Sequence, residues 1–123
     1  MSFTVYIASF LLIFWGMAHL FATRNVVKGF GELSPDNHNI ILMEWVIEGL
    51  TLIFLGILAL LMLWFVGLKT SAGMIVIHSI VGMLMVLAIW ALFTGNRIAF
   101  LPFKLCFPIF MTASVLLLLA VYF

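Results

Sequence analysis

Three side chains with acid–base chemistry stand within apolar stretches of this sequence. Glu44 and Glu48 lie four residues apart in IILMEWVIEGLTLIF, and His19 lies near the end of an earlier apolar run. At 100° per residue, Glu44, Glu48 and Thr51 fall on one face of a helix. Carboxylates and an imidazole in an apolar setting could hold or transfer a proton, or bind a polar ligand group. Which of these they do depends on the elements that hold them.

The composition places these residues in a membrane protein. Of the 123 residues, 67% are hydrophobic and 7% are charged, and the mean hydropathy is +1.42. A soluble domain carries about 25% charged residues, so this chain has too few to cover a water-facing surface. We interpret residues 1–123 as a single integral membrane domain. The net charge of +1 gives no argument for a nucleic acid partner.

Four apolar segments are long enough to cross the roughly 30 Å core of a bilayer. We predict an all-α bundle of four transmembrane helices in up-down-up-down order, over residues 3–23, 35–68, 71–94 and 103–123. The first segment lacks a basic start and is longer than the core of a signal peptide, so we expect it to be retained. At the start of the second, Ser34 is the predicted N-cap and Pro35 the first helical residue.

Glycines and prolines mark the expected breaks and contacts. Gly29 and Gly31 argue against a helix through RNVVKGFGELSPDNHN, which we interpret as a loop. Pro108 either opens the fourth helix or kinks it. Gly49 and Gly56 form a small-residue seam on the second helix, suited to close contact with a neighbouring helix or with another copy of the chain.

Depth in the bilayer, at 1.5 Å per residue, groups the polar residues. Measured from the expected cytoplasmic boundary, His19 and Glu44 lie about 6 Å deep and Glu48 about 12 Å deep. We predict that these three converge as a ligand-binding or proton-handling site, with Thr51 and Thr112 as further members. The alternative is a hydrogen-bonded clamp that only ties the second helix to the first.

His78 lies at about 24 Å, much deeper than His19. We predict that it forms a secondary polar site with Tyr6 and Ser9, which have a similar depth. The difference of about 18 Å between the two histidines excludes a haem held by both.

No metal or other cofactor is predicted. His19, Glu44 and Glu48 could supply three metal ligands, but glutamates at i and i+4 are commoner as a simple polar face of a helix. The single cysteine, Cys106, excludes an intrachain disulfide and every redox motif that needs two cysteines.

Lys and Arg residues predict the orientation. Residues 24–39 carry Arg24 and Lys28, residues 95–104 carry Arg97 and Lys104, and the remaining loop carries Lys69 alone. We therefore expect a multi-pass protein of the cell inner membrane, with residues 24–39 and 95–104 in the cytoplasm and both termini outside. Trp45 is expected in the aromatic belt at the inner interface.

Two stretches carry a resemblance to a known group. They are WGMAHLFATRNVVKGFG, with a histidine near the end of the first helix, and ILMEWVIEGLTLIF in the second. On these stretches, and in size and layout over its whole length, the chain resembles the small four-helix bacterial membrane proteins grouped as DoxX-like. The resemblance implies a four-helix fold and no particular activity, because many such proteins have none assigned.

Three functional hypotheses follow. The first is a non-enzymatic membrane protein whose polar pocket binds a small lipophilic or quinone-like ligand, or which supports a larger membrane complex. The second is a proton- or ion-coupled transporter that acts as a homo-oligomer, since four helices are few for a transport path. The third is an enzyme that uses His19 and a glutamate as acid and base on a lipid. The expected partners are the lipid bilayer, a lipophilic small molecule, and further copies of the chain or other membrane proteins.

Overall fold

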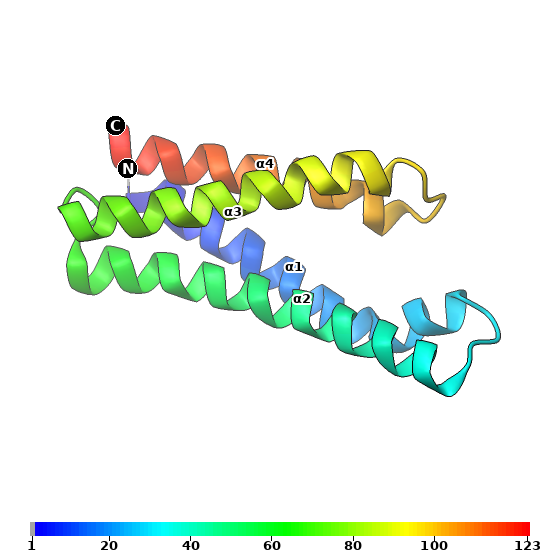
Figure 1. The fold of residues 1–123 in the computed structure, drawn as a ribbon. Coiled ribbons are helices and arrows are strands. Elements are labelled where there is room, and N and C mark those ends of the chain that lie inside the picture. The colour runs from blue at the N-terminus through cyan, green and yellow to red at the C-terminus, as the bar shows by residue number, and fades with distance from the viewer. Residues whose placement is uncertain (1) are drawn as a thin grey trace.

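The computed structural model describes residues 2–123 and folds them into four long helices (Figure 1). These are α1 (Ser2–Gly29), α2 (Pro35–Leu61), α3 (Ser71–Gly95) and α4 (Leu101–Tyr122), with a π-helical turn, η1 (Met62–Val66), that continues α2. The prediction of an all-α chain with four helices is confirmed. Each helix, with η1 counted as part of α2, is long and apolar enough to cross a membrane.

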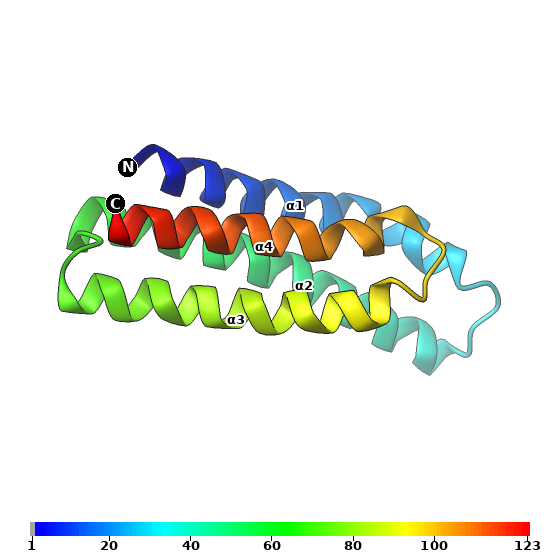
Figure 2. The ribbon, with the colours of Figure 1, turned by 90° about the horizontal axis from the view of Figure 1, so that it is seen from above.

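The segments that connect the helices lie at the two ends of the molecule. Both chain ends and the turn between η1 and α3 lie at one end, and the 30–34 and 96–100 segments lie at the other (Figures 1 and 2). His19, Glu44 and Glu48 therefore belong to the half of the molecule nearer the 30–34 segment.

α1 is longer than predicted. It ends at Gly29 and not near Thr23, so the first part of the expected loop is helical. Val26 and Val27 are buried and stabilise this extension. The break falls at Gly31, whose φ of +76° is a left-handed conformation that glycine adopts without strain.

Local signals explain the other helix ends. Ser34 is the N-cap of α2, and its side chain accepts a hydrogen bond from the Asn37 amide at 3.2 Å, as predicted. Pro108 lies inside α4, so it does not open that helix. Because proline has no N–H, the Lys104 carbonyl lacks its usual helical hydrogen bond there.

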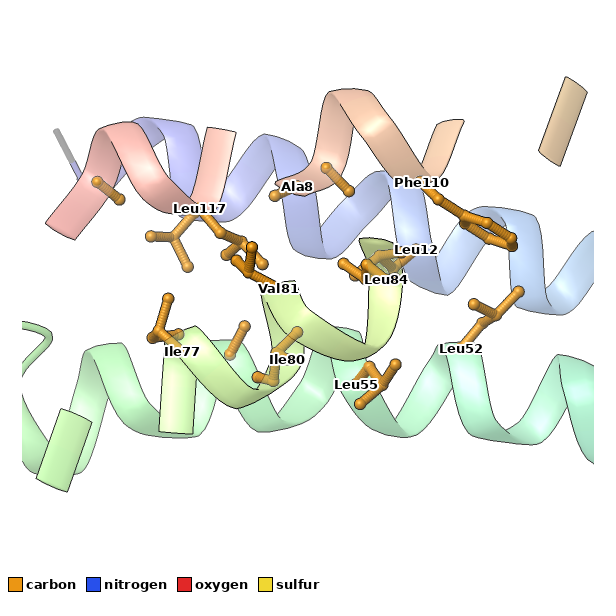
Figure 3. Close-up of a cluster of buried hydrophobic side chains, with 14 of the residues drawn as sticks. Ala8, Leu12, Leu52, Leu55, Ile77, Ile80, Val81, Leu84, Phe110 and Leu117 are labelled. Atoms are coloured by element: carbon orange, nitrogen blue, oxygen red, sulfur yellow. The ribbon is translucent and has the colours of Figure 1, made fainter. Parts of the chain in front are cut away.

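The apolar core joins the helices unevenly. α1 packs mainly on α2 and α3 mainly on α4, while α1 also packs on α4. Figure 3 shows part of the core, in which the labelled side chains are Ala8, Leu12, Leu52, Leu55, Ile77, Ile80, Val81, Leu84, Phe110 and Leu117. α2 and α3 make little contact, and Figure 1 shows them separating with distance from the turn that joins them. They separate in the half of the molecule that holds Glu44 and Glu48.

Large apolar side chains also cover the outside of the helices. Phe10, Phe54, Val86 and Leu119, one from each helix, are all exposed. Monomeric soluble proteins rarely expose apolar patches of more than a few hundred Å². The four candidate spans and this apolar exterior fit a multi-pass membrane protein.

Candidate functional site

A close contact between α1 and α2 positions the functional side chains. A Cβ atom added to Gly49 would lie 2.9 Å from the Gly16 carbonyl oxygen, and one added to Gly16 would lie 2.5 Å from the Gly49 carbonyl oxygen. Only glycine allows two helix backbones to approach this closely. His19 follows Gly16 by one helical turn and Glu48 directly precedes Gly49, so the contact brings these two side chains together.

The seam of Gly49 and Gly56 is therefore used within the chain. A Cβ atom on Gly56 would lie 2.9 Å from the Ser9 carbonyl oxygen of α1. The interpretation of this seam as a contact surface for another copy of the chain is wrong, because α1 already covers it.

Of the five residues predicted for the main site, His19 is the most buried, with 3% of its surface exposed. Its Nδ1 lies 2.8 Å from the Trp15 carbonyl oxygen. Since a carbonyl oxygen can only accept, Nδ1 carries the hydrogen and donates it. The other ring nitrogen, Nε2, lies 3.4 Å from Oε1 of Glu48. Within residues 2–123, Nε2 has no partner with hydrogen-bond geometry.

Trp45 fixes the imidazole from the side of α2. Its ring stacks on His19, with ring centroids 4.5 Å apart and planes inclined by 28°. Its Nε1 donates a hydrogen bond of 2.7 Å to the His19 carbonyl oxygen. Trp45 is buried, and its expected position at the inner membrane interface stays a prediction. It precedes Gly49 by one turn, where the close approach of α1 places its ring over His19.

Cys106 of α4 is a member of the site that the sequence analysis missed. One ligand atom each from His19, Glu48 and Cys106 lie within 4.8 Å of one another. Cys106 is buried, and its Sγ donates to the Pro102 carbonyl oxygen at 3.6 Å. A signal was present in the sequence. Cys106 follows Lys104, at the expected cytoplasmic boundary, by two residues, so its expected depth is about 3 Å and similar to that of His19.

Glu44, Glu48 and Thr51 line a groove between α2 and α3, which we call the α2–α3 groove. Its volume is about 420 Å³, and the rest of its lining consists of Phe30, Ile40, Ile41, Trp45, Ile47, Leu52, Met83, Leu87 and Phe103. An adjoining cavity of about 250 Å³ shares Glu48, Leu87 and Phe103 with it and reaches Cys106. Glu48 therefore lines the groove and also lies beside the buried imidazole of His19.

Two of the predicted members differ in their surroundings. The Thr51 hydroxyl donates to the Ile47 carbonyl oxygen at 2.8 Å and lies beside Glu48 in the α2–α3 groove. Thr112 is exposed and lies away from the site. The inward face of α4 carries Cys106, Phe110 and Ala113, which leaves Thr112 on its outer side. The prediction that Thr112 joins the site is wrong.

The predicted secondary site around His78 is not assembled. His78 Nε2 lies 2.8 Å from the Tyr122 hydroxyl, and its Nδ1 lies 2.7 Å from the Met74 carbonyl oxygen. Tyr6 instead accepts a hydrogen bond of 2.9 Å from Trp64 Nε1. Ser9 is fully buried, and its Oγ has no hydrogen-bond partner in the part of the chain that the structure describes. The side chain that hydrogen-bonds to His78 from another helix therefore belongs to α4 and not to α1.

Comparison with known proteins adds no relative. No protein-family model matches the chain, and neither a curated protein nor a solved structure does.

Proposed function

We propose that the chain crosses the cell inner membrane four times in up-down-up-down order and binds a small lipophilic molecule in the α2–α3 groove. The four apolar helices support the membrane assignment. The positive charges near the 30–34 and 96–100 segments support a cytoplasmic position for that end of the molecule.

The observation that carries the proposal is the position of both acids in an otherwise apolar groove. Ionisable residues inside a membrane segment are costly and are usually functional. Ligand pockets typically have volumes of about 300–1,000 Å³ and a few polar groups in an apolar lining. The α2–α3 groove has a volume of about 420 Å³, with Glu44, Glu48 and Thr51 as its polar groups beside many apolar side chains.

The lining also suggests the class of ligand. Carboxylate oxygens accept hydrogen bonds, so a hydroxyl or amine head group would suit Glu44 and Glu48. The apolar side chains around them suit an aliphatic or aromatic body. His19 stands behind Glu48, at 3.4 Å, and could exchange a proton with it when a head group binds.

Thermal unfolding of the purified protein in detergent tests this proposal. A panel of lipophilic alcohols, amines and quinols should contain members that raise the melting temperature of the wild-type protein. The double variant Glu44→Gln and Glu48→Gln should lose that increase, because amides replace both carboxylates. Glu32→Gln, at an exposed position of the 30–34 segment, is the matched control and should keep it. An equal increase in the double variant would refute the proposal.

A further inference from the structure

We propose that His19, Glu48 and Cys106 form a binding site for a divalent transition-metal ion, with Zn²⁺ as the best-suited ion. We call these three residues the α1–α2–α4 cluster, after the helices that supply them. Ligand atoms from the three lie within 4.8 Å of one another. This proposal goes beyond the function proposed above and does not depend on it.

The tautomer of His19 points to a cation near Nε2. Nδ1 donates to the Trp15 carbonyl oxygen, so in the neutral imidazole the lone pair of Nε2 faces Glu48. A lone pair opposite a carboxylate oxygen at 3.4 Å is unfavourable unless a proton or a metal ion lies between them. Nε2 is buried and has no hydrogen-bond partner among residues 2–123. Nε2 therefore offers a lone pair that is directed into the cluster and that no described residue uses.

The distances suit a small tetrahedral ion. Zn²⁺ binds nitrogen, oxygen and sulfur at about 2.0–2.3 Å, which places tetrahedral ligand atoms about 3.3–3.8 Å apart. The separation of 3.4 Å between His19 Nε2 and Glu48 Oε1 already falls in that range. All three ligand atoms lie within 4.8 Å of one another, so binding an ion would only have to shorten the separations to the Cys106 sulfur.

Charge balance allows a divalent ion to replace the protons of the cluster. A neutral imidazole, a carboxylate and a thiolate carry two negative charges between them, so one divalent ion makes the cluster neutral. Neutrality matters because an uncompensated charge inside a bilayer is costly. Binding releases the thiol proton of Cys106 to solvent, and it also releases any proton held between His19 and Glu48.

The surroundings resemble those of natural zinc ligands. A metal-bound histidine almost always donates its other ring N–H to a carboxylate, a carbonyl or water, as His19 does to Trp15. Trp45 holds the ring plane by stacking. A cavity of about 250 Å³ lies beside Glu48 and Cys106, so water or another ligand could reach the fourth position from it. Three protein ligands and one open position define the catalytic type of zinc site, in which water or substrate takes the fourth place.

Cobalt substitution tests the proposal on the full chain. Co²⁺ is added to the protein in detergent, purified with a tag that contains no histidine, and without any lipophilic ligand. The wild-type protein should bind one equivalent of Co²⁺, show a thiolate-to-cobalt charge-transfer band in the near ultraviolet, and lose the band when Zn²⁺ is added. Because the chain has a single cysteine, that band can arise only from Cys106.

Variants assign the remaining ligands. Cys106→Ser should abolish the band, and His19→Gln or Glu48→Gln should weaken Co²⁺ binding at least tenfold. His38→Gln changes an exposed histidine outside the cluster and should bind as the wild type does. If Cys106→Ser fails to fold, the wild-type spectrum still decides.

Absence of the charge-transfer band, or Co²⁺ binding that only His38→Gln removes, would overturn the proposal. Neither result would bear on ligand binding in the α2–α3 groove, which is measured without added metal.

Discussion

At the scale of single residues, His19 is held from several directions, while its Nε2 has no hydrogen-bond partner among residues 2–123. Trp15 accepts from Nδ1, Trp45 stacks on the ring, and the His19 carbonyl oxygen accepts from both Trp45 and Thr23. The ring therefore has little freedom to turn, and Nε2 is kept toward Glu48 and Cys106. A fixed donor atom of this kind suits proton exchange or metal binding better than a mobile one.

Replacing Trp45 by phenylalanine tests how much this positioning stabilises the fold. Trp45→Phe keeps an aromatic ring over His19 but removes the buried hydrogen bond of 2.7 Å to its carbonyl oxygen. We expect a loss of about 1–2 kcal/mol in the free energy of unfolding, measured by SDS titration in mixed micelles. Trp90→Phe is the control, since Trp90 is 70% exposed, and it should change stability by less than about 0.5 kcal/mol. Equal losses in the two variants would contradict this assignment.

The sequence predicted part of the site correctly at this scale. The expected depth grouped His19, Glu44 and Glu48, and the structure brings His19 and Glu48 of this group together. Depth alone does not give the rotation of a helix about its axis, which is why Thr112 was included and is exposed. The rotation of α4 is set by the packing of Phe110 and Leu117 in the core, and a single sequence contains no direct record of that packing.

At the scale of elements, the contact of α1 with α2 is the feature that creates the site. The seam itself was visible in the sequence as Gly49 and Gly56, but its partner was not. Gly16 is one glycine in an apolar run, and only the three-dimensional arrangement shows that it faces Gly49. The extension of α1 to Gly29 was missed for a related reason, since burial of Val26 and Val27 outweighs the weak helix propensity of the glycine.

An alanine at Gly49 should disrupt this contact. The added methyl group would lie 2.9 Å from the Gly16 carbonyl oxygen and 3.0 Å from His19 Cβ, so the helices must move apart. Overpacking costs about 1–3 kcal/mol, and the better helix propensity of alanine returns up to about 1 kcal/mol. We therefore expect Gly49→Ala to lower the free energy of unfolding by about 1–2 kcal/mol in the same titration.

Gly82→Ala is the matched control on α3. A Cβ atom there meets no atom within 4 Å among the described residues. Helix propensity alone should then raise stability, by up to about 1 kcal/mol. Destabilisation by Gly82→Ala as large as that by Gly49→Ala would show that the close α1–α2 contact is not the cause.

At the scale of the whole molecule, the end that holds the 30–34 and 96–100 segments should face the cytoplasm. Single cysteines can be introduced at exposed positions on a Cys106→Ala background: Glu32→Cys and Asn96→Cys at one end, Ser2→Cys and Lys69→Cys at the other. A membrane-impermeant maleimide added outside intact cells should label the second pair alone. Labelling of the first pair from outside would invert the proposed orientation, and labelling of one member of each pair would contradict the up-down-up-down order.

The α2–α3 groove is also a property of the whole molecule, because it exists where α2 and α3 make little contact. The central claim of the proposed function is that this groove, which Glu44 and Glu48 line, is open to a ligand. The most direct test is a high-resolution experimental structure of the protein in a lipid bilayer. We predict ordered non-protein density within the groove, with a polar end beside Glu44 and Glu48 and an apolar body against Met83 and Leu87. A structure in which α3 packs directly on α2, so that side chains of the chain itself fill the groove, would contradict the account.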